Sequence, residues 1–102
     1  MKLMTEELRK NLPSLYSQDG KGLDAVAVVH YFSPFSNWDW YGTEFDGEDR
    51  FFGLVKGFET ELGYFSLAEM SAAKVKIGGV EMPAVERDLH WTPKSLRDIK
   101  ES

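Results

Sequence analysis

The sequence predicts an α+β domain: an antiparallel sheet of four or five strands, ordered largely as a meander, with three short helices packed against it. Two observations predict this class. Residues 37–66 hold nine of the fourteen aromatic residues, in three segments separated by two turns, which is the pattern of consecutive antiparallel strands. Helix-start signals stand near residue 66, at the end of this region, and near residues 5 and 92, toward the two ends of the chain.

The composition limits the classes of protein to which this chain can belong. A chain of 102 residues is the size of one domain, and 42% hydrophobic with 28% charged residues is ordinary for a globular one. The chain has no cysteine, which fits a reducing compartment. The longest apolar run, residues 25–29, is far shorter than the roughly 20 residues that span a membrane, and no signal-peptide segment precedes it. We therefore expect a cytoplasmic protein with no membrane attachment.

The net charge of −5 is concentrated in the middle of the chain. Between residues 39 and 61, Arg50 and Lys56 stand against seven acids: Asp39, Glu44, Asp46, Glu48, Asp49, Glu59 and Glu61. Elsewhere the acids and bases cancel. Sequence-independent nucleic-acid binding needs Lys and Arg against the phosphates, so this acidic centre argues against a DNA or RNA partner.

The N-terminal segment predicts a short helix and then a loop. Thr5 precedes two acids, as an N-cap residue does, and the helix is expected over about 6–11, ended by Pro13. Residues 17–22, SQDGKG, form a polar loop that lacks the spacing of a phosphate-binding P-loop.

Residues 24–33, DAVAVVHYFS, predict the first strand. Both of its faces are apolar, which suggests a central strand. His30 shares one face with Val26, Val28 and Phe32. We expect it to be buried or half-buried with one hydrogen-bond partner, rather than catalytic.

The next feature is a hairpin, with strands over about 38–45 and 50–58 joined by the turn Asp46-Gly47-Glu48-Asp49. If the turn holds an odd number of residues, Phe45 opposes Phe51 and Tyr41 opposes Val55. This register sorts the apolar residues best. It places Tyr41, Phe45, Phe51 and Val55 on one face, and Trp38, Trp40, Phe52, Leu54 and Phe58 on the other. A slip of one residue would reshuffle both sets.

A turn and a fourth strand follow the hairpin, over residues 57–61 and 62–65. Ser66 then has the place of an N-cap, with Glu69 at the third helical position to complete a capping box. Phe65 and Met70 are spaced as a hydrophobic staple. Together they predict a helix over about 67–74.

Residues 76–83, which contain Gly78-Gly79, are expected to form a loop or a brief turn. After them, Val85, Leu89 and Trp91 alternate with polar residues, which predicts a half-exposed fifth strand. His90 should point outward from that strand.

The last element is a predicted helix of about two turns. Thr92 has the place of an N-cap and Pro93 that of the first helical residue, while Trp91 and Leu96 are spaced as a staple. No internal repeat, low-complexity tract or linker is visible in the sequence.

Both faces of the predicted hairpin are aromatic, and three short helices have little apolar surface with which to cover them. Either the helices divide between the two faces and the tryptophans pack in the core, or one face keeps an exposed aromatic patch. Exposed patches on monomers mark partner sites. The candidate partner-binding residues are Trp38, Trp40, Glu44, Asp46, Phe52 and Phe58.

No signature of a reaction accompanies this patch. The carboxylates near the turn could ligate calcium or magnesium, but they lack the spacing of an EF-hand, and turns carry Asp and Gly for conformational reasons. The sequence has no nucleophile elbow and no dinucleotide-binding glycine motif, and two histidines sixty residues apart make a poor zinc site. We expect no catalytic residue, no metal and no cofactor.

Three long phrases of the sequence carry a resemblance to a known family. They are MTEELRKNLPSLYSQDGKG (4–22), SNWDWYGTEFDGEDRFFGLVKGFETELGYFSL (36–67) and VERDLHWTPKSL (85–96). The family they resemble is an uncharacterised bacterial one, domain of unknown function 2958. The resemblance implies a bacterial, intracellular protein of a kind often encoded on plasmids, phages and other mobile elements, and it implies no activity, cofactor or catalytic residue.

Three functions are compatible with these observations. The first is a non-enzymatic protein-interaction module that uses the aromatic, acidic hairpin region to engage another protein or itself. The second is an acidic inhibitor that imitates the charge of DNA toward a nucleic-acid enzyme, and the modest net charge counts against it. The third is a small hydrolase or metal-dependent enzyme built on the carboxylates. An exposed apolar patch around the tryptophans would favour the first, a continuous stripe of carboxylates the second, and carboxylates converging on a histidine the third.

Overall fold

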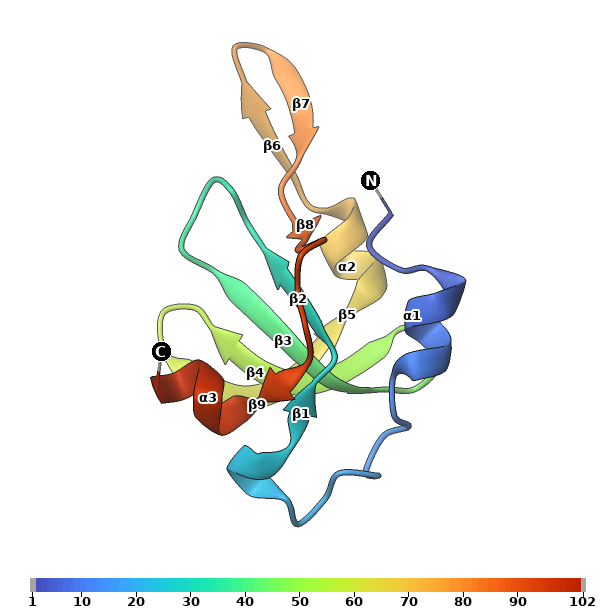
Figure 1. Ribbon diagram of the computed structural model, residues 1–102. Helices are drawn as coiled ribbons and strands as arrows, with labels where there is room; N and C mark the ends of the chain where they lie inside the picture. The colour runs from blue at the N-terminus through green and yellow to red at the C-terminus, as the bar shows by residue number, and fades with distance from the viewer. Residues whose placement is uncertain (1, 102) are drawn as a thin grey trace.

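A five-stranded antiparallel sheet forms the centre of the computed structural model, which describes residues 2–101 (Figure 1). The strand order is β5-β4-β3-β2-β8, so four consecutive strands form a meander and β8 pairs with the outer side of β2. The strands are β2 (Val29–Phe32), β3 (Asp39–Phe45), β4 (Arg50–Lys56), β5 (Thr60–Ser66) and β8 (Glu86–Arg87). The predicted α+β class and the meander order are confirmed.

Two small sheets and short helices complete the fold of the described residues. The first small sheet pairs β1 (Val26–Ala27) with β9 (Lys94–Ser95), and the second pairs β6 (Lys74–Ile77) with β7 (Val80–Pro83). The helices are α1 (Glu6–Asn11), α2 (Leu67–Ala72) and α3 (Leu96–Glu101), with a 3-10 turn, η1, at Gly22–Asp24.

The first two helices begin where the sequence predicts. The Thr5 side chain accepts a hydrogen bond from the Leu8 N–H, and the Ser66 side chain accepts one from the Glu69 N–H. Each side chain satisfies a backbone donor that has no partner within its helix. α2 ends two residues earlier than predicted because the chain is already extended at Ala73 and enters β6.

The sheet has a hydrophobic core on each face, so the helices divide between the two faces. On one face, α2 and the N-terminal segment cover Val29, Tyr31, Phe45, Phe51, Met70 and Val85, together with Leu3 and Leu12. On the other face, α3 and the β1–β9 pair enclose Ala25, Ala27, Tyr41, Leu54, Leu96 and Ile99. Most of the aromatic surface of the hairpin is therefore inside the protein.

The hairpin register is only partly as predicted. Phe45 opposes Phe51, which confirms the odd turn, but Tyr41 opposes Leu54 and not Val55. A β-bulge between Gly42 and Glu44 inserts one extra residue into β3 and reverses the faces beyond it. Tyr41 and Leu54 consequently share one core, whereas Trp40 packs against the core of Phe45 and Phe51.

Gly53 permits this bulge. A Cβ atom at that position would lie 1.8 Å from the backbone oxygen of Tyr41, far inside van der Waals contact. The two strands can approach this closely only because residue 53 has no side chain.

Two predicted segments near the C-terminus are wrong. The fifth strand is limited to Glu86–Arg87, because Asp88 turns the chain by accepting a hydrogen bond from the His90 N–H. His90 is exposed as predicted, but Leu89 is exposed as well. α3 begins at Leu96 and not at Pro93, since residues 94–95 pair with β1 and the Ser95 side chain accepts from the Asp98 N–H.

The predicted first strand is two strands, because its ends pair with different neighbours. β1 pairs with β9, whereas β2 pairs with β3 and β8. Val28 lies between them. The central position that its apolar faces suggested is confirmed for β2, which lies between β3 and β8.

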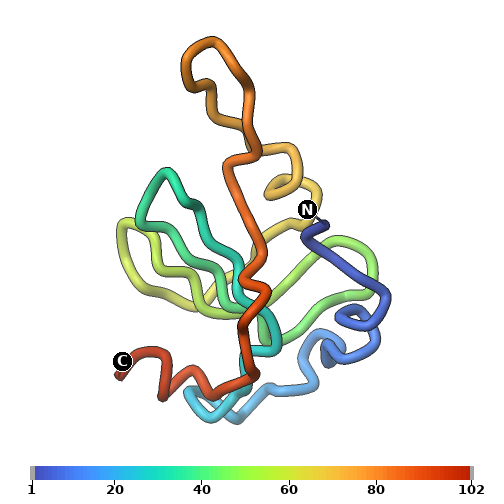
Figure 2. Tube along the Cα trace, turned by 45° about the horizontal axis from the view of Figure 1, so that its top comes forward, coloured from blue at the N-terminus to red at the C-terminus, as the bar shows by residue number. Residues whose placement is uncertain are grey.

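The expected loop at residues 76–83 is instead part of a regular β-hairpin, β6–β7, which we call the arm (residues 74–83). Gly78 and Gly79 both have positive φ, 59° and 82°, as a two-residue hairpin turn requires. Figures 1 and 2 both show the arm extending away from the rest of the molecule.

Candidate functional site

Three of the six predicted partner-binding residues form a row of aromatic rings, which we call the aromatic ladder (Phe58, Trp38, Trp40). The ring of Phe58 meets that of Trp38 edge-on, with centroids 5.4 Å apart, and the Trp38 and Trp40 centroids are 5.9 Å apart. The Phe58 side chain is 95% exposed, whereas both tryptophans are half-buried. Phe58 is therefore the exposed end of the ladder, and the two tryptophans are its more buried part.

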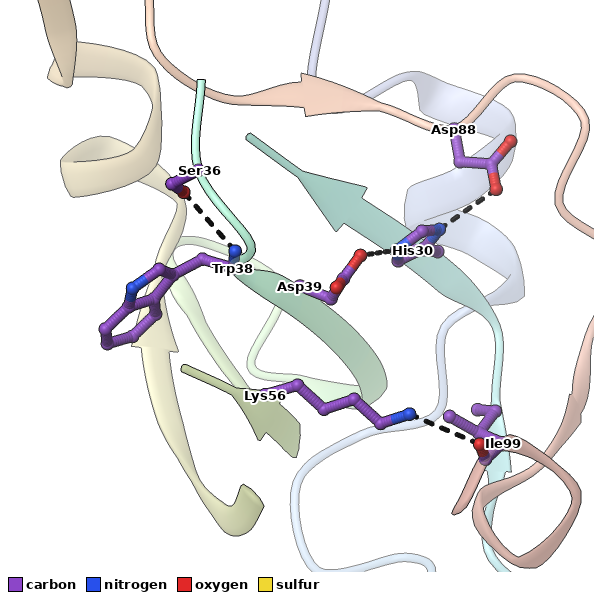
Figure 3. Close-up of polar contacts among 7 residues, drawn as sticks. All are labelled: His30, Ser36, Trp38, Asp39, Lys56, Asp88 and Ile99. Carbon is purple, nitrogen blue, oxygen red and sulfur yellow. Dashed lines mark hydrogen bonds and ion pairs between the residues drawn. The ribbon is translucent and has the colours of Figure 1, made fainter. Parts of the chain in front are cut away.

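Trp38 is held in place from two directions. Its backbone N–H donates to the Ser36 hydroxyl at 3.3 Å, and its indole points away from Asp39 (Figure 3). The indole lies against Gly57, where a Cβ atom would come within 2.5 Å of the ring. The turn between β4 and β5 thus provides a flat backbone surface on which the ring rests.

The inner end of the ladder opens into an apolar groove of about 260 Å³. Trp40 lines it together with Phe65 and Met70, and its remaining lining residues are Ser33, Ser36, Ser66, Glu69, Ala73, Ala84 and Val85. We call this set the groove. The groove lies beside the base of the arm, since Ala73 and Ala84 immediately precede and follow the arm in the sequence.

The arm is amphipathic. Its cross-strand pairs place Val75 opposite Met82 and Ile77 opposite Val80, so these four apolar side chains share one face. The other face carries Lys74, Lys76, Glu81 and Pro83. At the tip, Ile77 is 49% and Val80 61% exposed. The apolar face of the arm is therefore open to water.

The other three predicted residues do not join the ladder. Phe52 lies on β4 and packs edge-on against Tyr64, with centroids 5.1 Å apart. Glu44 is only 3% exposed, and its carboxylate accepts hydrogen bonds from the Tyr16 N–H at 2.8 Å and the Gln18 N–H at 2.7 Å. Its role is to anchor the loop that precedes β1, and the sequence gives no local signal of this.

Asp46 has a conformational role at the turn between β3 and β4. One of its carboxylate oxygens accepts from the N–H groups of Asp49, Glu48 and Arg50. These backbone donors hold the pKa of the Asp46 carboxyl below its usual 3.8. Glu44 and Asp46 thus stabilise the fold. The three predicted residues that do lie together, Phe58, Trp38 and Trp40, are all aromatic.

A cluster that the sequence did not predict surrounds His30, and we call it the histidine centre (His30, Asp39, Asp88). Nε2 of His30 lies 2.7 Å from Oδ1 of Asp39, and Nδ1 lies 2.9 Å from Oδ2 of Asp88 (Figure 3). The imidazole stacks on Tyr41 with centroids 4.5 Å apart. The expectation of a half-buried histidine is confirmed, but that of a single hydrogen-bond partner is wrong: it has two. No spacing rule links Asp88 to a histidine 58 residues away.

The geometry assigns the histidine centre to holding strands together. Both ring nitrogens of His30 have a carboxylate partner within hydrogen-bond distance. Neither ring nitrogen is therefore free to face a nucleophile. The two bonds join β2 to β3 and to the turn after β8.

The surroundings of the histidine centre also shift the pKa values of Asp88 and Tyr41. Burial by itself would raise the pKa of Asp88, but hydrogen bonds from His30 and from the His90 N–H outweigh it, so the pKa lies below 3.8. Burial, with Asp39 and Asp88 nearby, raises the pKa of the Tyr41 phenol to about 12.

Lys56 stands opposite Asp39 in the neighbouring strand. Its ammonium donates to the backbone oxygen of Ile99 at 3.3 Å and lies 5.7 Å from the centroid of the Tyr41 ring (Figure 3). It thereby ties the last helix to the sheet. Like the histidine centre, it contributes to the fold.

Two further observations concern the described residues as a whole. Within residues 2–101, no group of three or more His, Cys, Asp or Glu side chains, the histidine centre included, has an arrangement that could hold a metal ion. No helix in this range has both the length and the apolar character to cross a membrane.

Comparison with known proteins places the chain in a family. Searches of curated proteins and of solved structures find no match. A family model described as "Protein of unknown function (DUF2958)" matches residues 3–97, which is nearly the whole chain and includes the ladder, the groove, the arm and the histidine centre. The chain therefore belongs to the DUF2958 family.

Proposed function

We propose that this protein is a non-enzymatic protein-interaction module whose contact surface is the aromatic ladder and the groove behind it. The observation that carries the proposal is the Phe58 ring, which is 95% exposed and yet joined ring to ring with Trp38 and Trp40. An isolated exposed phenylalanine needs no explanation, but a connected row of three aromatic rings that ends in an apolar groove is typical of a partner site.

The ladder has the physical properties of a binding hot spot. Aromatic side chains dominate the binding energy of protein interfaces, and complete burial of one such ring contributes roughly 1.5–3 kcal/mol. Trp38 already rests on Gly57 and has its N–H bonded to Ser36, so it loses little conformational freedom when a partner covers it.

The alternative functions receive less support from the same geometry. Of the seven acids between residues 39 and 61, Glu44 is buried and Asp39 is bonded to His30. Of the other five, Asp46, Glu48 and Asp49 lie at one end of β4, and Glu59 and Glu61 lie near its other end, in the following turn and in β5. They do not form the single stripe that a DNA mimic needs. An enzyme built on His30 would need a free ring nitrogen, and both nitrogens have carboxylate partners. The proposal includes a cytoplasmic setting, which a chain without cysteine fits.

The experiment compares partners captured by the wild type, Phe58→Ala, Trp38→Ala and Leu89→Ala. Leu89 is the matched control, because it is also a large exposed apolar residue but lies outside the ladder. We expect a partner that the wild type and Leu89→Ala retain and the ladder variants lose. The partner is then purified and titrated calorimetrically, where Phe58→Ala should weaken binding by about ten-fold or more. A partner bound equally by all four proteins would overturn the proposal.

A further inference from the structure

The edge strand β5 presents backbone groups that have no hydrogen-bond partner among residues 2–101. β5 is the outermost strand of the order β5-β4-β3-β2-β8, so only one of its sides is paired. The Leu67 N–H donates to the Asp49 oxygen, and the Gly57 N–H donates to the Glu59 oxygen, which fixes the phase of the ladder at both ends. Because bonded pairs alternate along an antiparallel ladder, the odd-numbered residues of β5 bond β4 and the even-numbered ones point outward.

The outward N–H and C=O groups belong to Thr60, Leu62 and Tyr64, and we call these groups the free edge. No hydrogen bond to them is found in the described part of the chain. β5 pairs with β4 over its whole length without a bulge, and it contains neither proline nor lysine, the residues that usually protect an edge. The opposite edge strand, β8, is only two residues long. The free edge is therefore a template for one more strand.

The side chains beside the free edge are apolar on one face of the sheet. Leu62 is 47% and Tyr64 is 51% exposed. Next to Leu62 the structure has a cavity of about 200 Å³, and Phe52, Leu62 and Leu96 supply apolar parts of its lining. Asp19 also lines this cavity. An added strand would thus meet a pocket for one of its alternate side chains, which is how strand addition gains specificity.

The other face of β5 carries an acid. Glu61 is exposed and lies opposite the uncharged Val55 of β4. The guanidinium of Arg50 lies over the Tyr64 ring, 5.5 Å from its centroid, and belongs to the residue paired with the far end of β5. A lysine or arginine on the same face of an added strand would therefore find a carboxylate at Glu61.

We propose that the free edge binds an extended segment of another protein, which pairs antiparallel with β5 and has apolar side chains alternating with lysine or arginine. Its apolar side chains lie opposite Leu62 and Tyr64, and its cations lie on the face of Glu61. Antiparallel pairing continues the arrangement of the whole sheet and is the more stable of the two. The free edge and its cavity share no residue with the ladder or the groove, so this inference does not depend on the proposed function.

The probe is the capped peptide Lys-Val-Lys-Val-Lys-Val-Lys, titrated into the full chain up to about 5 mM. Amide hydrogen exchange followed by NMR gives the readout. Without peptide, the Leu62 and Tyr64 amides should exchange rapidly, whereas the Gly63 amide, which faces β4, should be protected. The peptide should slow exchange at Leu62 and Tyr64 by about three-fold or more and leave Gly63 nearly unchanged.

Peptides with one methylated backbone nitrogen test the direction of the hydrogen bonds. In the antiparallel arrangement the valines lie directly opposite Leu62 and Tyr64, so their N–H groups face β5, while the lysine N–H groups face away. Methylation at the central valine should therefore abolish the slowing of exchange. Methylation at the neighbouring lysine should leave it nearly intact, because that nitrogen donates nothing to β5.

Glu61→Lys tests the charge. It should weaken peptide binding by about three-fold or more, because a lysine of the peptide then meets another cation. Glu81→Lys is the matched control, since Glu81 is also exposed but lies on the arm, and this variant should bind the peptide as the wild type does. Chemical-shift titration measures both affinities.

Unchanged exchange at Leu62 and Tyr64 throughout the titration, or equal effects of the two methylated peptides, would overturn the inference. Protection of these amides that rises with protein concentration in the absence of peptide would assign the free edge to a second copy of the chain, and would overturn it as well. Trp38→Ala should keep the full response to the peptide. The failure of the ladder proposal and the failure of this one are therefore distinguishable.

Discussion

Oδ2 of Asp88 lies 2.9 Å from Nδ1 of His30, and this contact joins residues 58 positions apart in the chain. The same histidine bonds Asp39 through its other nitrogen. Together the two contacts tie the C-terminal segment to the central strands, and the carboxylate–imidazole geometry has a consequence for stability that depends on pH.

Asp88→Asn should lower the free energy of unfolding by about 1–2 kcal/mol at pH 7, because a charge-assisted hydrogen bond becomes a neutral one. The pKa of Asp88 is lower in the folded state than its ordinary 3.8. Its contribution is therefore fully present above pH 3.8 and is lost as the pH falls through the folded-state pKa. The difference between wild type and variant should shrink on acidification to about pH 3, as urea unfolding at both pH values measures.

Glu81→Gln, on the exposed face of the arm, makes the same change of carboxylate to amide without a histidine partner and should leave stability nearly unchanged. A deficit of Asp88→Asn that is equal at both pH values would show that packing, and not the charge, accounts for the loss.

Gly53→Ala should destabilise the protein by about 3 kcal/mol or more, because its Cβ would overlap the backbone oxygen of Tyr41. Gly63 lies directly opposite in β5 and has no atom within 4 Å of a built Cβ. Gly63→Ala should therefore change stability by less than about 1 kcal/mol. Chemical unfolding of both variants measures the contrast, and an equal cost would mean that strand propensity, and not the bulge, dominates at Gly53.

Tyr16 has a φ of 71°, a conformation that side chains disfavour. Its N–H donates to the buried Glu44 carboxylate, which holds the backbone in this state. Tyr16→Gly should be more stable than Tyr16→Ala by about 1 kcal/mol, because both remove the same ring and only glycine relieves the strain. Thermal and urea unfolding of the two variants measure the difference. If alanine is equally stable, the loop has rearranged and Glu44 does not fix the φ angle.

Local signals predicted the elements whose physics is local. The Thr5 and Ser66 caps mark the starts of α1 and α2, and Asp46 to Asp49 mark the turn that pairs Phe45 with Phe51. These features depend on residues within a few positions of one another, so a single sequence contains them.

Features that depend on distant contacts were missed. The bulge in β3 exists because Gly53, on β4, lets the backbone of Tyr41 come close to it. The bulge places Tyr41 and Trp40 on the faces opposite to those expected. Glu44 was a candidate partner-binding residue, but it is buried and accepts hydrogen bonds from N–H groups more than twenty residues away. Trp38 and Phe58 were correctly placed in one group, because they flank adjacent ends of β3 and β4 and their rings meet although the pairing there is shifted by one residue.

The arm was also missed, for a different reason: Gly78-Gly79 is a hairpin signal as well as a loop signal, and only the alternation of Val75 and Ile77 with lysines separates the two. Because few contacts hold the arm to the sheet, it should open independently of the body. In native-state hydrogen exchange of dilute protein, its amides should exchange about 100-fold or more faster than those of β3 and β4. Protection equal to that of the central strands in dilute protein would contradict the independence of the arm.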